Sequence, residues 1–329
     1  MVDEHFRSYA EQTVHYFDRS NEGVLDSPLD VPAAWRGADL VQDVSWRFRL
    51  TAEHVAELEA ALCVAKRTGR PTGELTVEDF PLTALGSAIV SWRNALDGGR
   101  GFVLISGVPV ERFGEADAQI FFWGLGLHLG RPGAQNPDGD LLGHVIDTGE
   151  DAANPLVRLY RTSSDIAYHC DAADVVGLLC LTKAKEGGLS RIASSVTVWN
   201  EVVRRRPDLA SRLFDTFPLD IRNEERSGMA GWLPIPPCRY GGGQLRTFYH
   251  SDYFRSAPRH ADAPALEGAD LELLDLYDEI AVSEDVRLDM DLEPGDIQLV
   301  SNHTVIHART GYEDTPDARR HLLRLWLSL

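Results

Sequence analysis

Two side chains able to bind a metal stand two residues apart in the stretch YHCDAADVV, residues 168–176. The valines that follow predict an extended strand, and in a strand the side chains at i and i+2 point to the same face. His169 and Asp171 would then present an imidazole and a carboxylate side by side, while Cys170 faces the other way. This arrangement is either half of a metal site or a hydrogen-bonded pair.

The stretch NHTVIHART near the C-terminus supplies two further histidines, His303 and His307. Two histidines and one carboxylate form the ligand set of non-haem Fe(II) oxygenases, which leaves three coordination positions open. One distal histidine would complete such a set with His169 and Asp171. The preceding turn, LEPGD, predicts a strand that leads to these histidines.

The last strand, RRHLLRLWLSL, is the second place where chemistry is indicated. Alternation puts Arg320, Leu322, Arg324 and Trp326 on one face and leucines on the other, with the two arginines about 13 Å apart. If this face lines the interior of a closed sheet, each guanidinium needs an anion, because an unpaired buried charge is costly. If it faces solvent, the two arginines carry no functional meaning.

A second H-x-D pair, His260 and Asp262, lies between prolines in a loop-like stretch. It lacks a strand that would hold both side chains on one face, so we interpret it as structural. The same interpretation, surface or satisfied core residues, applies to His5, His15, His54, His128 and His144.

The composition narrows the class of protein. The formal net charge of −19 argues against nucleic acid and anionic membranes as partners, since both attract basic patches. The four cysteines have no C-x-x-C spacing, and the N-terminus is polar and charged, so we expect reduced thiols in a cytoplasmic protein. No apolar run is long enough to span a bilayer. A small molecule is the expected partner, and association into a homo-oligomer stays open.

The order of predicted elements favours a mainly β core with flanking helices, an α+β class, in one domain. Helices are predicted from Thr51 to Gly69, over 82–97, over 115–130, over 195–217 with a break at Pro207, and over 271–282. Strands are predicted over 99–110, 156–162 and 167–184, around 297–309, and at the C-terminus.

Four pieces in this order make the chain resemble the taurine dioxygenase (TauD)/TfdA-like family of Fe(II)- and 2-oxoglutarate-dependent oxygenases. They are YHCDAADVVGLLCL, EGGLSRIASSVTVWNE, PGDIQLVSNHTVIHARTGYED and RRHLLRLWL. The resemblance implies a double-stranded β-helix, the jelly-roll or cupin-like barrel. It also implies an N-terminal extension over 1–30 and a single oxygenase domain over 31–329 with a helical insert at about 197–285.

The resemblance further implies roles for individual residues. His169, Asp171 and His307 match the catalytic iron ligands, while Arg320 and Ser190 match the residues that contact the distal carboxylate of 2-oxoglutarate. Arg324 matches a position that holds an acidic substrate group in some members. The implied cofactors are Fe(II), 2-oxoglutarate as cosubstrate and O2. Cys170 stands where threonine is usual, which puts little in doubt because this side chain points away from the metal.

The residues themselves support these roles in part. The arginine fork matches a carboxylate bidentately, which lysine cannot do. Arg324, together with Arg309, suggests an acidic substrate group, and Asp165 could meet an amine. We therefore expect oxidation, by default hydroxylation, of a small acidic or amino-acid-like substrate.

Three alternatives differ in class. In the first, His169 and Asp171 only hydrogen-bond to each other. In the second, the chain is a metal-binding barrel without oxygenase activity or a zinc hydrolase, since zinc accepts the same ligand set; neither needs Arg320 with Ser190. The third, a halogenase, requires that the carboxylate be absent, and Asp171 is present.

Overall fold

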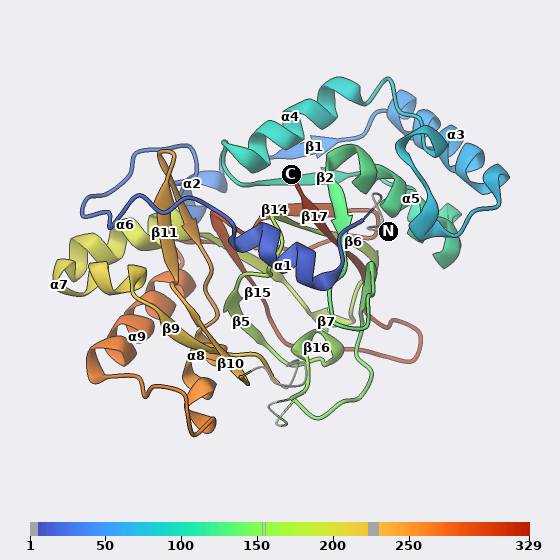
Figure 1. The fold of residues 1–329 in the computed structure, drawn as a ribbon. Helices are drawn as coiled ribbons and strands as arrows, with labels where there is room; N and C mark the ends of the chain where they lie inside the picture. Colours follow the sequence, from blue (N-terminus) through green and yellow to red (C-terminus); the bar gives the residue numbers. More distant parts are fainter. Residues whose placement is uncertain (1–5, 153, 155, 223–229) are drawn as a thin grey trace.

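The computed structural model describes residues 6–152, 154, 156–222 and 230–329. Its centre is a pair of facing β-sheets with helices on the outside (Figure 1). The larger sheet has the strand order β1-β2-β14-β6-β17-β3, and β4 also pairs with β17. Its strands are β1 (Arg47–Arg49), β2 (Phe102–Ser106), β14 (Ile297–Ser301), β6 (Val175–Thr182), β17 (His321–Ser328), β3 (Arg131–Gly133) and β4 (Leu142–Val145).

The smaller sheet has the order β13-β8-β15-β5 and is antiparallel throughout. Its strands are β13 (Arg287–Met290), β8 (Ser190–Ser194), β15 (Val305–Arg309) and β5 (Ile166–His169). Short two-stranded ladders lie outside the two main sheets: β7 (Glu186–Gly187) with β16 (Tyr312–Glu313), β9 (Phe217–Asp220) with β10 (Trp232–Ile235), and β11 (Cys238–Gly241) with β12 (Gln244–Thr247).

One hydrophobic cluster fills the space between the two sheets. Val176, Val300 and Trp326 enter it from the larger sheet, and Ile192 and Val305 enter it from the smaller one. The alternating face of β17 that carries Trp326 therefore points into the barrel, while Leu323 and Leu325 point outward. The predicted mainly β core with outer helices, a jelly-roll barrel, is confirmed.

Helices cover the outer faces of both sheets. The helices α3 (Ala52–Thr68), α4 (Gly86–Asp97) and α5 (Glu115–Leu129) contribute to the core behind the larger sheet. The helices α6 (Ser195–Arg205), α7 (Pro207–Ala210), α8 (Ser251–Ser256) and α9 (Gly268–Val282) contribute to the core behind the smaller sheet. Two shorter helices near the N-terminus are α1 (Tyr9–Phe17) and α2 (Gly37–Leu40).

Local sequence signals explain several of these boundaries. Thr51 caps α3 by accepting a hydrogen bond from the His54 amide, and Gly69 ends the helix with a φ of 68°, as predicted. The predicted break at Pro207 separates α6 from α7. Helix α1 is held to the barrel, because Ser328 at the end of β17 donates a hydrogen bond to Gln12.

Four regions differ from the predicted elements. The strands predicted over 167–184 and around 297–309 are each divided in two, as β5 with β6 and β14 with β15, and the two parts lie in different sheets. The predicted strand over 156–162 is wrong: the stretch contains only a 3-10 turn, Leu159–Arg161. At the end of this stretch and just after it, the backbone carbonyls of Thr162 (2.7 Å) and Ser164 accept hydrogen bonds from the Arg309 guanidinium rather than from a neighbouring strand. The segment 197–285, expected to be helical, also contains the strands β9–β12.

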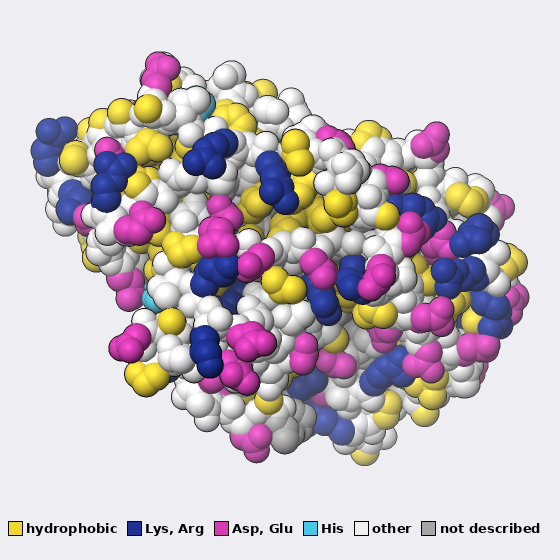
Figure 2. All heavy atoms as spheres, turned by 180° about the vertical axis from the view of Figure 1, so that it is seen from behind, with side chains coloured by type: hydrophobic (Ala, Val, Ile, Leu, Met, Phe, Trp, Pro, Cys, Tyr) yellow, Lys and Arg dark blue, Asp and Glu magenta, His cyan; other side chains and the backbone are white. Residues whose placement is uncertain are grey.

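The outer surface matches the composition. Basic and acidic side chains are interspersed on the face seen in Figure 2. Within the described part of the chain, no helix is both long and apolar enough to cross a membrane. All four cysteines are free thiols.

Candidate active site

The fold brings His169, Asp171 and His307 together. His307 on β15 pairs directly with His169 at the end of β5, and Asp171 follows two residues later. One potential ligand atom from each of the three side chains lies within 4.8 Å of the others. His307 Nε2 is 3.7 Å from the Asp171 carboxylate, too far for a hydrogen bond. The three groups converge on a common point rather than bonding to one another, which is the arrangement that a shared metal ion requires.

Neighbouring groups fix the orientation of two members of this triad. His169 Nδ1 lies 2.9 Å from the carbonyl of Ala167 and donates to it, which leaves Nε2 as the acceptor. The Asp171 carboxylate accepts a hydrogen bond from the Trp326 indole (3.2 Å), and the Asp171 amide donates to Asn302 (3.1 Å). These contacts hold the side chains in the geometry of ligands.

Protonation states also suit metal binding. Burial raises the pKa of Asp171, but the positive charge of Arg324, the adjacent His307 and His169 rings and the hydrogen bond from Trp326 outweigh it, and the pKa lies below its ordinary value. Burial is the main cause that lowers the pKa of His307 to about 3, with a further contribution from His169. At neutral pH the site therefore offers a carboxylate and a neutral imidazole, the forms that bind a metal.

The Trp326 contact leads to a prediction. Trp326→Phe removes the donor to Asp171, and loss of a hydrogen bond that orients a metal ligand typically weakens metal affinity by about 10- to 100-fold. We expect that loss for Fe(II) in an anaerobic titration. The matched control is Trp46→Phe, because Trp46 lies in the same cluster and donates to the Leu40 carbonyl away from the triad. Equal losses in both variants would contradict a specific role of the indole.

Arg320 is buried at the start of β17 and lacks an acidic partner. Its Nη1 has no hydrogen-bond partner among the described residues, and its Nη2 makes only a long contact (3.4 Å) with the Gly188 carbonyl. The guanidinium lies 5.2 Å from the centre of the Tyr312 ring. Because a buried, unpaired guanidinium is costly, this position fits an anion that the barrel binds.

The G-G-x-S segment makes room for this guanidinium. Gly188 has a φ of +72°, and a Cβ atom there would lie 2.8 Å from Arg320 Nε, so a side chain is excluded on both grounds. Two residues later, Ser190 is buried and its hydroxyl donates to Gln298 on the opposite sheet (2.9 Å). Ser190 thus points into the barrel, as its expected role requires, with its hydroxyl engaged by Gln298.

Arg324 lies next to the triad. Its Nη1 is 4.0 Å from the Asp171 carboxylate, and its guanidinium lies 4.5 Å from the centre of the Tyr160 ring. Gln135 holds it from two sides, accepting from Arg324 Nε (2.6 Å) and donating to the Arg324 carbonyl (2.8 Å). The guanidinium is therefore fixed in place beside the triad.

Sequence reasoning did not identify Gln135, Tyr160 or the contact of Trp326 with Asp171. Gln135 and Tyr160 stand in stretches without a motif, and they reach Arg324 only through the tertiary fold. The one available signal was for Trp326, which alternation places on the same face as the two arginines.

The side chains of Arg309 and Asp165 hydrogen-bond to backbone groups. Arg309 is buried and donates to carbonyls of the loop before β5; burial and the charge of Arg320 lower its pKa to about 10. Asp165 is exposed, and its carboxylate accepts a hydrogen bond from the Gly311 amide (2.9 Å).

The remaining histidine motifs lie elsewhere. His260 bonds to the buried Asp220 (3.1 Å) rather than to the exposed Asp262, so this H-x-D pair does not form a shared site. His303 donates to Asp174 (2.8 Å) and stacks on Tyr16, with ring centres 4.6 Å apart. Of the two distal histidines, only His307 joins the triad.

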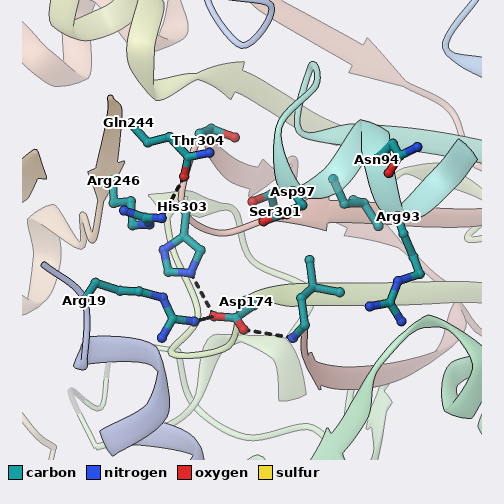
Figure 3. A pocket seen from close by; sticks show the side chains of 12 residues that line it. Arg19, Arg93, Asn94, Asp97, Asp174, Gln244, Arg246, Ser301, His303 and Thr304 are labelled. Carbon is teal, nitrogen blue, oxygen red and sulfur yellow. Dashed lines mark hydrogen bonds and ion pairs between the residues drawn. The ribbon is translucent and has the colours of Figure 1, made fainter. Parts of the chain in front are cut away.

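Asp174 is the centre of a polar network beside a cavity of about 270 Å³ (Figure 3). The buried carboxylate accepts from His303, from Arg19 (2.9 Å) and from the Leu329 amide (2.9 Å), and it also lies 2.9 Å from His15. No member of the triad lines this cavity. The network ties α1, the β14–β15 turn and the C-terminus together, which is a structural role.

Asp174→Asn is expected to lower the free energy of unfolding by about 3–5 kcal/mol, because it breaks a buried network and leaves its cations unpaired. Burial raises the pKa of Asp174, but hydrogen bonding and the charges of His303 and Arg19 pull it well below the ordinary value. The network therefore stabilises the fold above the unfolded-state pKa of about 3.9, and this contribution is lost as the pH falls through the lower folded-state pKa.

Urea denaturation of wild type and variant between pH 3 and 7 measures both effects. The difference between the two proteins should shrink toward the acid end. A difference that is constant over the whole range would contradict the assignment.

Comparisons with known proteins agree with this geometry. The family model described as "Taurine catabolism dioxygenase TauD, TfdA family" matches residues 67–326. FR-33289 synthase from Streptomyces rubellomurinus (strain ATCC 31215) is 31% identical over 314 residues, covering 93% of this chain and 92% of the synthase.

Two solved structures share the fold. Asparagine oxygenase in complex with Fe(II), 2S,3S-3-hydroxyasparagine and succinate superposes with a TM-score of 0.68 and 17% identity, over 86% of this chain and 93% of that one. The non-heme iron oxygenase OrfP in complex with Fe and alpha-ketoglutaric acid has a TM-score of 0.60 and 15% identity over the same shares. The family model covers well over half of the chain, and the chain therefore belongs to the taurine catabolism dioxygenase TauD, TfdA family.

Proposed function

We propose that this protein is an Fe(II)- and 2-oxoglutarate-dependent oxygenase that hydroxylates a small acidic or amino-acid-like substrate. One observation supports this most strongly: two imidazoles and a carboxylate converge at one end of a barrel whose last strand carries a buried guanidinium without an acidic partner. A hydrolytic zinc site has no use for that guanidinium, whereas a dicarboxylate cosubstrate does.

The proposed ligands of the iron are His169, Asp171 and His307. Bound iron, with 2-oxoglutarate and O2, supplies the oxidising power: one oxygen atom enters the substrate C–H bond as a hydroxyl, and the other enters succinate as CO2 leaves. The protein contributes two imidazoles, that of His307 in its neutral form, and an oriented carboxylate in a largely buried site.

The distal carboxylate of 2-oxoglutarate is proposed to bind Arg320, with Ser190 as a second contact. Burial favours this pairing, because a guanidinium and a carboxylate attract more strongly where water is scarce. The charges then balance: the two positive charges of iron and the one of Arg320 match Asp171 and the two carboxylates of the cosubstrate.

The substrate is proposed to place an acidic group on Arg324, which Gln135 and Tyr160 hold beside the triad. Asp165 is proposed to meet an amine at the rim of the site. This requires that its exposed carboxylate serve the substrate in addition to the Gly311 amide.

The test is a panel of amino acids and other small acids incubated with Fe(II), ascorbate, 2-oxoglutarate and the purified protein. We expect slow succinate release without substrate, faster release with the true substrate, and a product heavier by one oxygen atom in mass spectrometry. Full activity with zinc in place of iron, or turnover that does not depend on 2-oxoglutarate, would contradict the proposal.

The proposal also includes the domain organisation of the chain and its cellular setting. We propose a single oxygenase domain at residues 31–329 with a helical insert at about 197–285, and an N-terminal extension at residues 1–30, whose helix α1 contacts the barrel. A reducing, cytoplasmic setting is supported by the four free thiols.

A further inference from the structure

A second cluster of metal-binding side chains lies on the outer side of the larger sheet. It consists of Glu115, His144 and His321, whose ligand atoms lie within 4.8 Å of one another. His144 Nδ1 is 2.9 Å from His321 Nε2 and 3.9 Å from the Glu115 carboxylate. Within the described residues, only this group and the triad of the active site bring one ligand atom from each of three such side chains within 4.8 Å of one another.

The scaffold under this cluster is rigid. His144 lies on β4 and His321 on β17, two strands that hydrogen-bond to each other, with His144 opposite Leu323. Glu115 stands in the first turn of α5, which packs on the outer face of β17 through leucine side chains. The backbone at each of the three residues is therefore fixed by its own element, α5, β4 or β17. Only the side-chain torsions of Glu115, His144 and His321 can adjust to an ion.

The geometry suits a tetrahedral ion. Ligand atoms at about 2.0–2.2 Å from a tetrahedral Zn²⁺ lie roughly 3.3–3.6 Å apart. The observed 2.9 Å and 3.9 Å bracket this range, so small side-chain rotations are enough to close the site. Two imidazoles with one carboxylate favour zinc over magnesium or calcium, which prefer oxygen ligands alone.

The chemical state of the ligands also fits. Imidazole binds a metal in its neutral form, and His321 Nε2 already faces His144 Nδ1 at 2.9 Å. Glu115 and His144 are partly exposed, which leaves an ion room for water as its fourth ligand.

From this geometry we propose that Glu115, His144 and His321 form a second metal site, which binds Zn²⁺ and ties β4 and α5 to β17. The site is independent of the oxygenase function. Its consequence would be structural. Within the described residues, β4 pairs with β17 alone, and Gly143 on β4 lies opposite Arg324 on β17. A bound ion would hold β4 in place next to Arg324, the proposed substrate-binding arginine.

Cobalt(II) distinguishes the two sites, because a tetrahedral ion absorbs far more strongly in the visible region than a six-coordinate one. Metal-free, full-length protein is titrated with Co²⁺ without O2. We expect two ions per wild-type chain and intense tetrahedral bands. His144→Ala should bind one ion and lose these bands, while His307→Ala should bind one ion and keep them.

A second readout is the melting temperature, which Zn²⁺ should raise in His307→Ala but not in a double variant that also carries His144→Ala. Should His144→Ala fail to fold, Glu115→Gln takes its place, because Glu115 is exposed and its change leaves the sheet intact. A wild-type chain that shows no tetrahedral bands with excess Co²⁺, or tetrahedral bands that survive in both His144→Ala and Glu115→Gln, would overturn the proposal. Neither result bears on the active site.

Discussion

Substrate oxidation is expected to disappear when any one of His169, Asp171 and His307 is replaced by alanine. Each variant leaves at most two protein ligands for the iron, and no other described metal-binding side chain belongs to this cluster. His307 and Asp171 are largely buried, so no exposed neighbour can rotate into their place without displacing packed side chains. Product formation measured by mass spectrometry should fall below detection in all three variants.

The matched control for this experiment is the second H-x-D pair. Asp262→Ala changes an exposed carboxylate in the same spacing and should leave turnover intact. His260→Ala should also retain activity, with a loss of stability from the broken contact with Asp220. Activity that survives at the triad but vanishes with Asp262→Ala would place the iron site elsewhere.

Replacing Arg320 and replacing Arg324 are expected to weaken the binding of different ligands. Arg320→Ala removes a buried guanidinium and leaves the distal carboxylate of 2-oxoglutarate unpaired, a loss of about 2–5 kcal/mol. At about 1.4 kcal/mol per tenfold, the KM for 2-oxoglutarate should rise by more than tenfold. The same variant should bind Fe(II) normally, because Arg320 contacts no member of the triad.

Arg324→Ala should instead affect the substrate. The guanidinium held by Gln135 is lost, so the substrate binds weakly and succinate forms with less product than in the wild type. Both affinities and the ratio of succinate to product are measured in each variant. If Arg324→Ala loses 2-oxoglutarate affinity and Arg320→Ala does not, the assignment of the two side chains is reversed.

The sequence was sufficient to predict those parts of the site that depend on local periodicity. Alternation correctly put Arg324 and Trp326 on one face of β17, and the structure shows that this face points into the barrel. Arg320, one residue before β17, is also buried. The H-x-D spacing correctly predicted that His169 and Asp171 converge, with Cys170 packed on the other side. The predicted continuous strand is wrong at this point, because β5 ends at His169 and Asp171 lies in the segment that follows. The choice of His307 over His303 depended on family resemblance, since both histidines lie in the same stretch.

The remaining features depend on tertiary contacts. The stretch 156–162 is strand-like in composition, but the Arg309 side chain, almost 150 positions later, donates to the Thr162 carbonyl that a ladder would need. The hairpins β9–β10 and β11–β12 carry prolines and glycines that weaken a strand signal, and their pairing is fixed by packing. Gln135 reaches Arg324 across 189 residues, a contact that no local pattern encodes.

We propose that His169, Asp171 and His307 bind one Fe(II) to which 2-oxoglutarate then coordinates. Without O2, the complex of Fe(II) and 2-oxoglutarate in such a site absorbs visible light, and neither component does so alone. We expect wild-type protein to develop this band at one iron per chain, Asp262→Ala to match it, and His307→Ala to show none. A band of full intensity in His307→Ala, or its absence in folded wild-type protein, would contradict the account.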